Sequence, residues 1–374
     1  MVIAVNTRFL LPGKMEGFGY FTKEVAQRLA TKYPQHQFHF FFDRPFDKGY
    51  LFSGNVQGHV LSPPARHPLL WKYWFDVKVP RLLKKIKADV FFSPDGQCSL
   101  TTKVPQVLVV HDLAFLHHPD GYQQSHLCYY RHYTPTFIRK AKSVITISQF
   151  SKEDIVRQYK ISEEKISVVH NGANPIFTPI RFDEQAAVKE KYTGGFEYFL
   201  YAGAIQPRKN LINLLKAFSV FKRRLQSSMK LILAGRLAWK NDEFLSLLKT
   251  YKYKDDVVLT GYLQEAELAK LMASAYAFVY PSLFEGFGLP VIEAMKCGVP
   301  VLTSKASSME EISESAALLF DPQNVDEIAG ALMRVYKDEA ERRVLIEKGR
   351  LVADKYSWEN TAEGVWQELM KVVQ

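Results

Sequence analysis

The sequence predicts an α/β protein with two doubly wound domains, each built on a parallel sheet. Short, continuously apolar runs alternate with helix-like segments along almost the whole chain. Such runs are typical of parallel strands that are buried on both faces. The chain has 374 residues, of which 47% are apolar. That length exceeds what one hydrophobic core usually organises, and the apolar content is sufficient for two cores.

The first half contains six predicted strands and two predicted helices. The strands cover residues 2–5, 38–42, 90–92, 107–110, 144–147 and 166–169. The helices cover residues 20–30 and 151–159, and Ser151 is the predicted cap of the second. Residues 171–179 are rich in chain-breaking residues and predict a linker. The first domain is therefore assigned to residues 1–174.

The second half repeats this alternation over residues 175–356, the second predicted domain. Its strands cover residues 198–201, 231–233, 257–259, 277–280, 299–302 and 318–320. Its helices cover residues 209–226, 241–250, 265–275, 290–297 and 325–337. Residues 357–374 predict one more helix, which is amphipathic. Open α/β sheets bind ligands beyond the carboxyl ends of their strands, so two facing domains would place a ligand in the cleft between them.

The strongest functional signal is a strand, a glycine-rich loop and a helix over residues 277–295. Gly286 and Gly288 lack a Cβ and let a ligand lie close to the main chain. Pro290 suits the first turn of a helix whose N-terminus offers free N–H groups to an anion such as a diphosphate. Glu285 and Glu293 can accept hydrogen bonds from the hydroxyls of a sugar and of a ribose. The alternative for either Glu alone is an ordinary loop or surface carboxylate.

A second segment repeats the order strand, glycine, loop and helix. Gly203 follows the strand 198–201, and Arg208 and Lys209 lie near the start of the next helix. The helix dipole disfavours cations at that end, so a bound anion would relieve the conflict. Arginine also offers a bidentate fork to a phosphate. A solvated basic turn is the alternative.

Two weaker signals lie in the first domain. Gly17 and Gly19 follow the first strand and could wrap a phosphate or an acceptor, although an ordinary turn explains them equally well. His111 and Asp112 follow the apolar run 107–110. A histidine at a strand end can hydrogen-bond a sugar or an acceptor near neutral pH. Isolated His-Asp pairs are usually structural, so both interpretations stay open.

The positive charge is concentrated in the first half. Residues 1–178 hold 23 Lys and Arg against 13 Asp and Glu, whereas residues 179–374 hold 26 of each class. We expect the first half to face an anionic partner, such as a membrane or a phosphorylated acceptor. Residues 64–87 interleave aromatic and basic side chains, which suits a membrane interface or an ordinary amphipathic helix. Only the charge points to nucleic acid, and no nucleic-acid partner is expected.

Several patterns are absent from the sequence. There is no D-x-D, no HExxH and no Cys/His cluster, so no metal is expected, and there is no GxSxG of an α/β-hydrolase. The three cysteines are far apart, which argues against a disulfide scaffold. Neither a signal peptide nor an apolar stretch of roughly 18 residues is present, so we expect a cytoplasmic protein.

Together these motifs resemble the retaining glycosyltransferases of family 4, which have the GT-B fold. The most specific element is the Glu-x7-Glu pattern from Glu285 to Glu293. Supporting elements are Gly203 with Arg208-Lys209-Asn210, Gly261-Tyr262-Leu263, His111-Asp112, His170-Asn171-Gly172 and Tyr356-Ser357-Trp358. The resemblance covers nearly the whole chain. It implies two Rossmann-like domains facing across a cleft, with the acceptor on the first, the nucleotide sugar on the second, and the last helix crossing back to the first.

The resemblance also implies roles for individual residues. Glu285 would hold hydroxyls of the donor sugar, and His111 would lie beside the reacting sugar. Arg208 and Lys209 would hold the diphosphate, and Glu293 would hold the ribose. The other implied donor-binding residues are Gly17, Gly203, Tyr262, Leu263, Phe287, Gly288 and Leu289. The family loop often begins with two glycines, whereas Glu16 precedes Gly17 here, which puts the role of Gly17 in question.

The implied reaction is the metal-independent transfer of a hexose from a nucleotide sugar with retention of configuration. A front-face mechanism, in which the leaving phosphate helps to deprotonate the acceptor, is adopted as a hypothesis. No cofactor is implied. Replacing Glu285 by Ala should abolish transfer with little loss of fold. An epimerase, a glycogen-synthase-like enzyme and a catalytically silent nucleotide-sugar- or anion-binding protein are the alternatives within the same architecture.

The substrates are less sharply indicated. Residues 6–13 are similar to bacterial surface-polysaccharide enzymes, many of which are mannosyltransferases. GDP-mannose is therefore the first expectation for the donor, and a UDP-sugar is the second. The basic, aromatic first half suits a glycan or a polyprenyl-diphosphate-linked acceptor at the inner face of the cell membrane.

Overall fold

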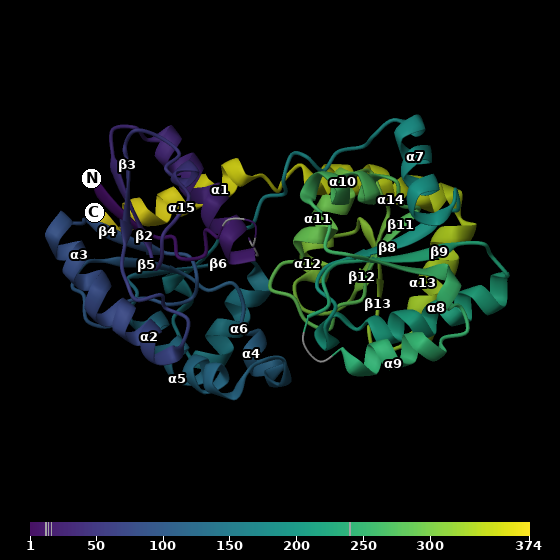
Figure 1. Ribbon diagram of the computed structural model, residues 1–374, viewed down its shortest axis with the longest axis horizontal. Coiled ribbons are helices and arrows are strands. Elements are labelled where there is room, and N and C mark those ends of the chain that lie inside the picture. The colour runs from purple at the N-terminus through teal and green to yellow at the C-terminus, as the bar shows by residue number, and fades with distance from the viewer. Residues whose placement is uncertain (12, 14, 16, 239–240) are drawn as a thin grey trace. The chain divides into compact units, whose positions relative to one another are not determined.

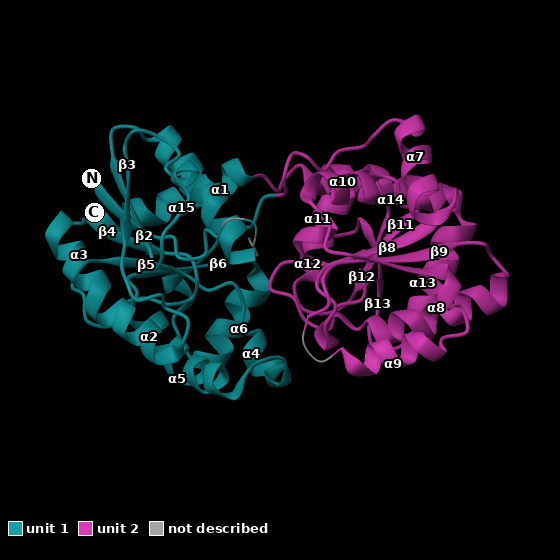
Figure 2. Cartoon of the chain, in the orientation of Figure 1, with its two compact units in different colours: residues 1–172, 358–374 teal, residues 173–357 magenta. Residues whose placement is uncertain are grey.

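The computed structural model describes residues 1–11, 13, 15, 17–238 and 241–374. The chain divides into two compact units (Figure 2). Unit 1 comprises residues 1–172 and 358–374, and unit 2 comprises residues 173–357. The first division falls inside the predicted linker, and the second falls at the start of the last helix.

Unit 1 is built on a seven-stranded parallel sheet in the order β3-β2-β1-β4-β5-β6-β7. Its strands are β1 (Val2–Asn6), β2 (Gln37–Phe42), β3 (Val56–Val60), β4 (Val90–Ser93), β5 (Gln106–Val109), β6 (Ser143–Thr146) and β7 (Ile166–Val168). Its α-helices are α1 (Gly17–Lys32), α2 (Pro68–Tyr73), α3 (Val79–Ile86), α4 (Ala114–His117), α5 (Gln124–Lys140), α6 (Gln149–Tyr159) and α15 (Trp358–Val373). A π-helical turn, Trp74–Lys78, joins α2 to α3.

The helices of unit 1 cover both faces of the sheet. Figure 1 shows α1 and α15 on one side and α2, α3 and α5 on the other. The last helix is fixed to α1 by ring stacking between Tyr33 and Trp366, whose centroids lie 3.8 Å apart. An ion pair of 2.9 Å joins Arg28 to Glu359 beside it. The amphipathic pattern of the last helix does not say what the helix packs against, and the structure shows that it packs in unit 1.

Unit 2 contains a six-stranded parallel sheet in the order β10-β9-β8-β11-β12-β13. Its strands are β8 (Tyr198–Ala202), β9 (Lys230–Ala234), β10 (Val257–Gly261), β11 (Ala277–Tyr280), β12 (Val301–Ser304) and β13 (Ala317–Phe320). Its helices are α7 (Phe182–Thr193), α8 (Leu211–Leu225), α9 (Asp242–Thr250), α10 (Glu265–Ala273), α11 (Leu289–Lys296), α12 (Met309–Ser313), α13 (Val325–Lys337) and α14 (Glu339–Ala353).

All twelve strands predicted from apolar runs are confirmed within a few residues, and one strand was missed. That strand, β3, reads Val-Gln-Gly-His-Val and lies at the edge of its sheet, so it needs no continuous apolar run. The predicted cap Ser151 is wrong by three positions. Helix α6 begins earlier, and the Oγ of Ser148 accepts the backbone N–H of Ser151 at 3.1 Å. Helices α4, α5, α7, α12 and α14 were not predicted, and α2 and α3 lie within residues 64–87, where an amphipathic helix was one of two interpretations.

Each sheet has one point where the strand order reverses. In unit 1 the reversal lies between β1 and β4, and in unit 2 it lies between β8 and β11. The loops that leave two such strands run to opposite sides of the sheet and open a crevice at the carboxyl ends, where ligands of doubly wound folds bind. The two reversal points therefore define where a site is expected in each unit.

Candidate active site

The reversal point of unit 2 carries the glycine-rich loop and helix α11. Gly288 precedes the helix with φ +102°, a left-handed conformation that favours glycine. A Cβ added to Gly288 would lie 2.2 Å from the Cε of Met309. Pro290 lies in the first turn of α11, as predicted. The loop therefore reaches the helix N-terminus by a path that only a glycine follows without strain.

Glu285 is the centre of a buried polar network. Its Oε1 accepts hydrogen bonds from Lys209 Nζ, from the hydroxyl of Ser282 and, at 3.2 Å, from the hydroxyl of Tyr280. Arg208 Nη1 forms an ion pair of 3.1 Å with the same oxygen. Within the described part of the chain, the hydrogen bonds to the Glu285 carboxylate all reach Oε1. The network thus fixes the carboxylate through one oxygen, and none of these hydrogen bonds uses Oε2.

Two cations keep Glu285 ionised. Burial raises the pKa of this carboxyl, but the charges of Arg208 and Lys209 and the hydrogen bonds from Lys209 and Ser282 outweigh it and lower the pKa to about 2. Lys209 is itself buried, donates to the hydroxyl of Tyr280 at 2.6 Å and lies 4.9 Å from the centre of that ring. The carboxylate is therefore a permanent anion that holds a buried ammonium in place.

The structure joins the two strongest sequence motifs of unit 2 into one site. Arg208 and Lys209 belong to the 3-10 turn between β8 and α8, and Glu285 follows the neighbouring strand β11. Arg208 also donates to the backbone carbonyl of Phe284. The sequence assigned these cations to a diphosphate and the carboxylate to a sugar, without predicting that the cations hold the carboxylate.

Four supporting residues were missed from the sequence. Tyr280 and Ser282 bond the Glu285 carboxylate, as described above. Ser307 Oγ accepts the N–H of Glu285 at 2.9 Å, and Ser308 donates to the carbonyl of Glu285 at 3.0 Å. The two serines follow β12, which pairs with β11, so topology brings them to the loop. The only signal for them was their position after a predicted neighbouring strand.

Glu293 lies one helical turn inside α11 and has a different environment. Its side chain is buried, and no hydrogen bond or ion pair to its carboxylate occurs among the residues that the structure describes. Burial and the nearby charge of Glu265 raise its pKa to about 8. In the unbound protein this carboxyl is therefore mostly protonated at neutral pH. A hydroxyl that donates a hydrogen bond to it would favour its ionised form.

The carboxyl ends of β8, β9 and β10 are lined by glycines with positive φ. A Cβ on Gly203 would meet the Tyr201 hydroxyl at 2.8 Å, and one on Gly235 would meet the carbonyl of Gly203 at 1.9 Å. Tyr262 follows β10 and is 60% exposed, and Leu263 beside it is half-buried. The exposed ring of Tyr262 can stack on a planar ligand, and the glycines beside it bring the main chain close to that position.

The other predicted donor-binding residues lie in the loop and in α11. Phe287 buries its ring against Tyr356, with the centroids 5.5 Å apart, and its carbonyl accepts from Ser308 at 2.9 Å. Leu289 is the first residue of α11. Phe287 therefore serves the loop as a packing residue in addition to offering its main chain.

His111 lies in unit 1, at the end of β5. Its Nε2 is 2.9 Å from the carbonyl oxygen of Pro94, so this nitrogen carries the proton and Nδ1 is an acceptor in the neutral ring. The rings of Phe18 and Phe21 pack against it, and burial lowers its pKa. Among the described residues no hydrogen bond joins Asp112 to the imidazole, and its Oδ1 accepts the N–H of Ala114 at 2.8 Å. The predicted pair is thus a neutral acceptor beside a turn-capping carboxylate.

The two glycines noted after the first strand, Gly17 and Gly19, have different surroundings in the structure. Gly17 begins α1, and a Cβ there would meet nothing within 4 Å. A Cβ on Gly19 would lie 2.7 Å from the carbonyl oxygen of Phe9. The question raised by Glu16 lies outside the described residues. In the described part of the loop, the steric need for glycine is at Gly19.

Gly288 permits a direct test of the loop geometry. Replacing Gly288 by Ala is expected to lower the free energy of unfolding by about 1–2 kcal/mol, because alanine resists the positive φ and displaces Met309. Gly330 in α13 is the matched control, since a Cβ there meets nothing within 4 Å. Gly330→Ala should stabilise the helix by up to about 1 kcal/mol. Urea unfolding of both variants checks this, and equal effects would contradict it.

Two further properties bear on the site. Within the described ranges, no three His, Cys, Asp or Glu side chains are grouped so as to hold a metal ion. None of the described helices is both long and apolar enough to cross a bilayer.

The chain matches two family models that together span most of its length. The model described as "Glycosyltransferase Family 4" matches residues 15–176. The model described as "Glycosyl transferases group 1" matches residues 182–352. The first match lies almost wholly in unit 1, and the second lies within unit 2.

Known proteins resemble the chain over nearly its full length. The chain is 28% identical to "O-antigen chain mannosyltransferase B" of Escherichia coli over 359 residues, which is 92% of this chain and 93% of that protein. Sucrose-phosphate synthase of Thermosynechococcus elongatus superposes with a TM-score of 0.79 at 20% identity, covering 99% of this chain and 98% of that one. Anabaena HepE in complex with UDP and glucose superposes with a TM-score of 0.76 at 17% identity, covering 99% and 100%. The structural matches show a shared fold.

Proposed function

Because the chain belongs to glycosyltransferase family 4 and has the GT-B fold, we propose that it transfers a hexose, with mannose as the first expectation, from a nucleotide sugar to a glycan in surface-polysaccharide biosynthesis. The observation that carries the proposal is the convergence of Glu285, Arg208 and Lys209 at the strand-order reversal of unit 2. A carboxylate fixed through one oxygen suits sugar hydroxyls at the other, and neighbouring cations suit a diphosphate.

The reaction is proposed to proceed with retention of configuration and without a metal ion. As the donor bond breaks, negative charge develops on the leaving diphosphate. Arg208 and the N-terminus of α11 supply fixed positive charge for it, and Lys209 adds a third source. In the front-face mechanism, the leaving phosphate takes the proton of the attacking acceptor hydroxyl. Glu285 holds the donor sugar through Oε2 while this happens.

His111 is proposed to hold a hydroxyl of the reacting sugar. Its neutral imidazole directs Nε2–H to Pro94, so Nδ1 is the atom that accepts the hydroxyl proton. Replacing His111 by Phe should lower kcat by about 10-fold to 100-fold with the fold intact, because the aromatic contacts with Phe18 and Phe21 are retained. Rate measurements at saturating donor check this, and an unchanged kcat would remove His111 from the site.

The donor is proposed to be GDP-mannose, because the E. coli relative is named a mannosyltransferase. A UDP-sugar is the second candidate, since HepE was solved with UDP and glucose. A thermal-shift screen of GDP-mannose, GDP-glucose, UDP-glucose and UDP-galactose should raise the Tm with either the GDP-sugars or the UDP-sugars, but not with both. No rise with any nucleotide sugar would contradict the proposed function. Conversion of the donor without an acceptor would instead identify an epimerase.

Unit 1 is proposed to contact an anionic membrane, where a polyprenyl-diphosphate-linked acceptor resides. On α2, Leu69 is 75% exposed and Tyr73 is 39% exposed, and α3 carries exposed Lys84 and Lys85. An apolar tip beside lysines suits the interface of an anionic bilayer.

A vesicle assay tests this contact. Reversing both charges with Lys84→Glu and Lys85→Glu should weaken binding to phosphatidylglycerol vesicles about tenfold or more, since each basic residue contributes about 1 kcal/mol. The matched control reverses Lys337 and Lys348, which are exposed on α13 and α14 of unit 2. Co-sedimentation at two salt concentrations measures the difference. Equal binding by both double variants would contradict the assignment of the membrane face to unit 1.

A further inference from the structure

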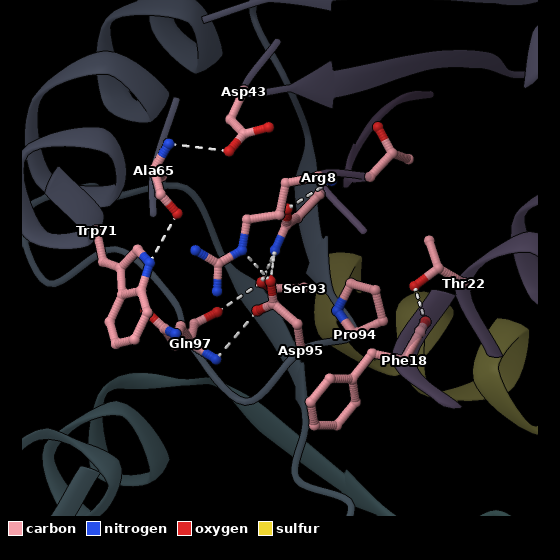
Figure 3. A network of polar contacts seen from close by, with 12 residues as sticks. Arg8, Phe18, Thr22, Asp43, Ala65, Trp71, Ser93, Pro94, Asp95 and Gln97 are labelled. Carbon is pink, nitrogen blue, oxygen red and sulfur yellow. Dashed lines mark hydrogen bonds and ion pairs between the residues drawn. The ribbon is translucent and has the colours of Figure 1, made fainter. Parts of the chain in front are cut away.

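Unit 1 contains a second buried polar network at its own strand-order reversal. Asn6 is the last residue of β1, Arg8 lies two residues beyond it, and Asp95 follows β4, the strand on the other side of the reversal (Figure 3). Asn6 Nδ2 donates to Asp95 Oδ2 at 2.7 Å and to Ser93 Oγ at 3.0 Å. This is the position in unit 1 where a doubly wound fold binds its ligand.

Arg8 is held at this network by one nitrogen only. Its Nε donates to Asp95 Oδ2, and its side chain is only 3% exposed. Among the described residues, neither terminal nitrogen of the guanidinium has a hydrogen-bond partner. Figure 3 shows the guanidinium extending between Asp95 and Trp71, with no dashed line at its two ends. A buried guanidinium normally uses most of its five N–H groups, so this one lacks partners.

The unpaired fork is not sealed inside the protein. In the described ranges, the fully enclosed side-chain atoms without a partner are Tyr159 Oη and the amide oxygens of Asn171 and Asn241. The terminal nitrogens of Arg8 are not among them, so each keeps a small solvent-accessible surface although the side chain as a whole is only 3% exposed. The Arg8 fork is therefore a nearly buried pair of donors at the strand-order reversal of unit 1.

Aromatic rings form the walls around the fork. The guanidinium carbon lies 4.9 Å from the ring centre of Phe9, 5.1 Å from that of Phe75 and 5.8 Å from that of Trp71. Trp71 is fixed by its indole N–H, which donates to the carbonyl of Ala65 at 2.7 Å, and it stacks on Tyr130. Aromatic rings can pack against the C–H groups of a pyranose, and a neighbouring guanidinium can donate to its hydroxyls.

The charge balance selects a neutral ligand over an anion. Asp95 already neutralises Arg8 through the ion pair, and its carboxylate would repel a phosphate placed at the guanidinium. A pair of adjacent sugar hydroxyls accepts the two donors of the fork without that repulsion. We propose that Arg8, with the Phe9 and Trp71 rings, forms a subsite that binds a neutral pyranose of the acceptor through two vicinal hydroxyls. This assignment rests on the proposed glycosyltransferase function.

The same loop connects this subsite to His111. Pro94 precedes Asp95, and its carbonyl fixes the protonated Nε2 of His111. Asp95, the next residue, pairs with Arg8, and Gly96 after it has φ +80°, so the chain turns sharply at this point. One short loop after β4 therefore positions both the Arg8 fork and the His111 acceptor.

The test measures binding of methyl α-D-mannopyranoside to the full chain by saturation-transfer NMR titration. Arg8→Lys keeps the charge beside Asp95 but removes the fork, and it should weaken binding about tenfold or more, the equivalent of one charge-assisted hydrogen bond. Arg157→Lys is the matched control, because Arg157 pairs with the buried Asp154 in the same unit and should leave binding unchanged. Phe9→Leu keeps the apolar volume and should weaken binding about threefold or more, which tests the subsite even if Arg8→Lys does not fold.

Several outcomes overturn the subsite. They are equal binding by wild type and Arg8→Lys, no binding of the mannoside by wild type, and Arg8-dependent binding of methyl phosphate in place of the mannoside. Binding of nucleotide sugars is measured in the same samples and should be unchanged in Arg8→Lys, because their proposed residues lie in unit 2. A wild type that binds the mannoside through Arg8 but binds no nucleotide sugar would contradict the proposed function and leave the subsite standing as a sugar site.

Discussion

Replacing Glu285 by Gln is expected to lower the rate of sugar transfer by about 10²–10³-fold. Glutamine keeps the size of the side chain but removes its charge, so the side chain becomes a weaker partner for sugar hydroxyls. Arg208 and Lys209 lose the anion that positions them at the same time. Initial rates with the donor identified by thermal shift measure the effect.

The same substitution is also expected to destabilise the fold, contrary to the expectation from the sequence that Glu285→Ala leaves it intact. Lys209 is 7% exposed, and the substitution removes the negative charge that pairs with its buried ammonium. Breaking a buried pair costs about 3–5 kcal/mol. In the wild type this stability is present above pH 4.5 and is lost as the pH falls toward about 2, because the folded carboxyl has the lower pKa.

A double variant separates the two effects. Adding Lys209→Met to Glu285→Gln removes the unpaired charge and should restore much of the lost Tm while transfer stays low. Glu314→Gln is the control, because Glu314 pairs with Lys355 at the surface and such pairs contribute about 0–1 kcal/mol. Near-normal turnover in folded Glu285→Gln protein would contradict the role of Glu285 in holding the donor sugar.

Sequence patterns were sufficient for the architecture because both sheets are parallel and buried. Apolar runs such as 107–110 mark a strand between two helix layers, whatever the long-range partners are. The edge strand β3 carries no such run and was missed. Helix α5 was missed as well, because it mixes histidines, tyrosines and an internal proline, and its Tyr129 packs on the ring of Trp71 from α2.

The site was predictable as a set of residues but not as a network. The glycine pattern placed Glu285 at a loop and Glu293 in a helix, since both follow from local spacing. The bond between Lys209 and Glu285 joins positions 76 residues apart, and only the pairing of β8 with β11 creates it. Arg8 was passed over for the same reason, because its partner Asp95 is 87 residues away and its unpaired fork has no local signature.

Replacing Glu293 by Gln is expected to stabilise the unbound protein and to weaken donor binding. In the folded protein the pKa of Glu293 is about 8, against 4.5 as the ordinary value, so folding favours the protonated carboxyl. The wild type therefore has this contribution in full below pH 4.5 and loses it as the pH rises through about 8. Glutamine is neutral at every pH. At pH 9 the variant should be more stable by on the order of 4 kcal/mol, and near pH 4.5 the two proteins should be nearly equal. Chemical unfolding across this pH range measures the difference.

Donor binding should have the opposite dependence on pH. A ribose hydroxyl donates more strongly to the ionised carboxylate, so binding should release a proton from Glu293 below pH 8. The affinity of the wild type for its nucleotide sugar should then rise by up to about tenfold per pH unit between pH 6 and pH 8, whereas Glu293→Gln should bind about 10-fold to 100-fold more weakly at pH 8 with little pH dependence. Calorimetry in buffers of different ionisation enthalpy counts the released proton directly.

A variant that retains the wild-type pH profile of donor binding would show that another group titrates. A variant that gains no stability at pH 9 would show that Glu293 is solvated. If Glu293 is a buried carboxyl that serves to bind the ribose, Glu293→Gln must both stabilise the unbound protein and weaken donor binding. The free energy that burial of the ionised carboxylate costs in the empty site is recovered only when the ribose is bound.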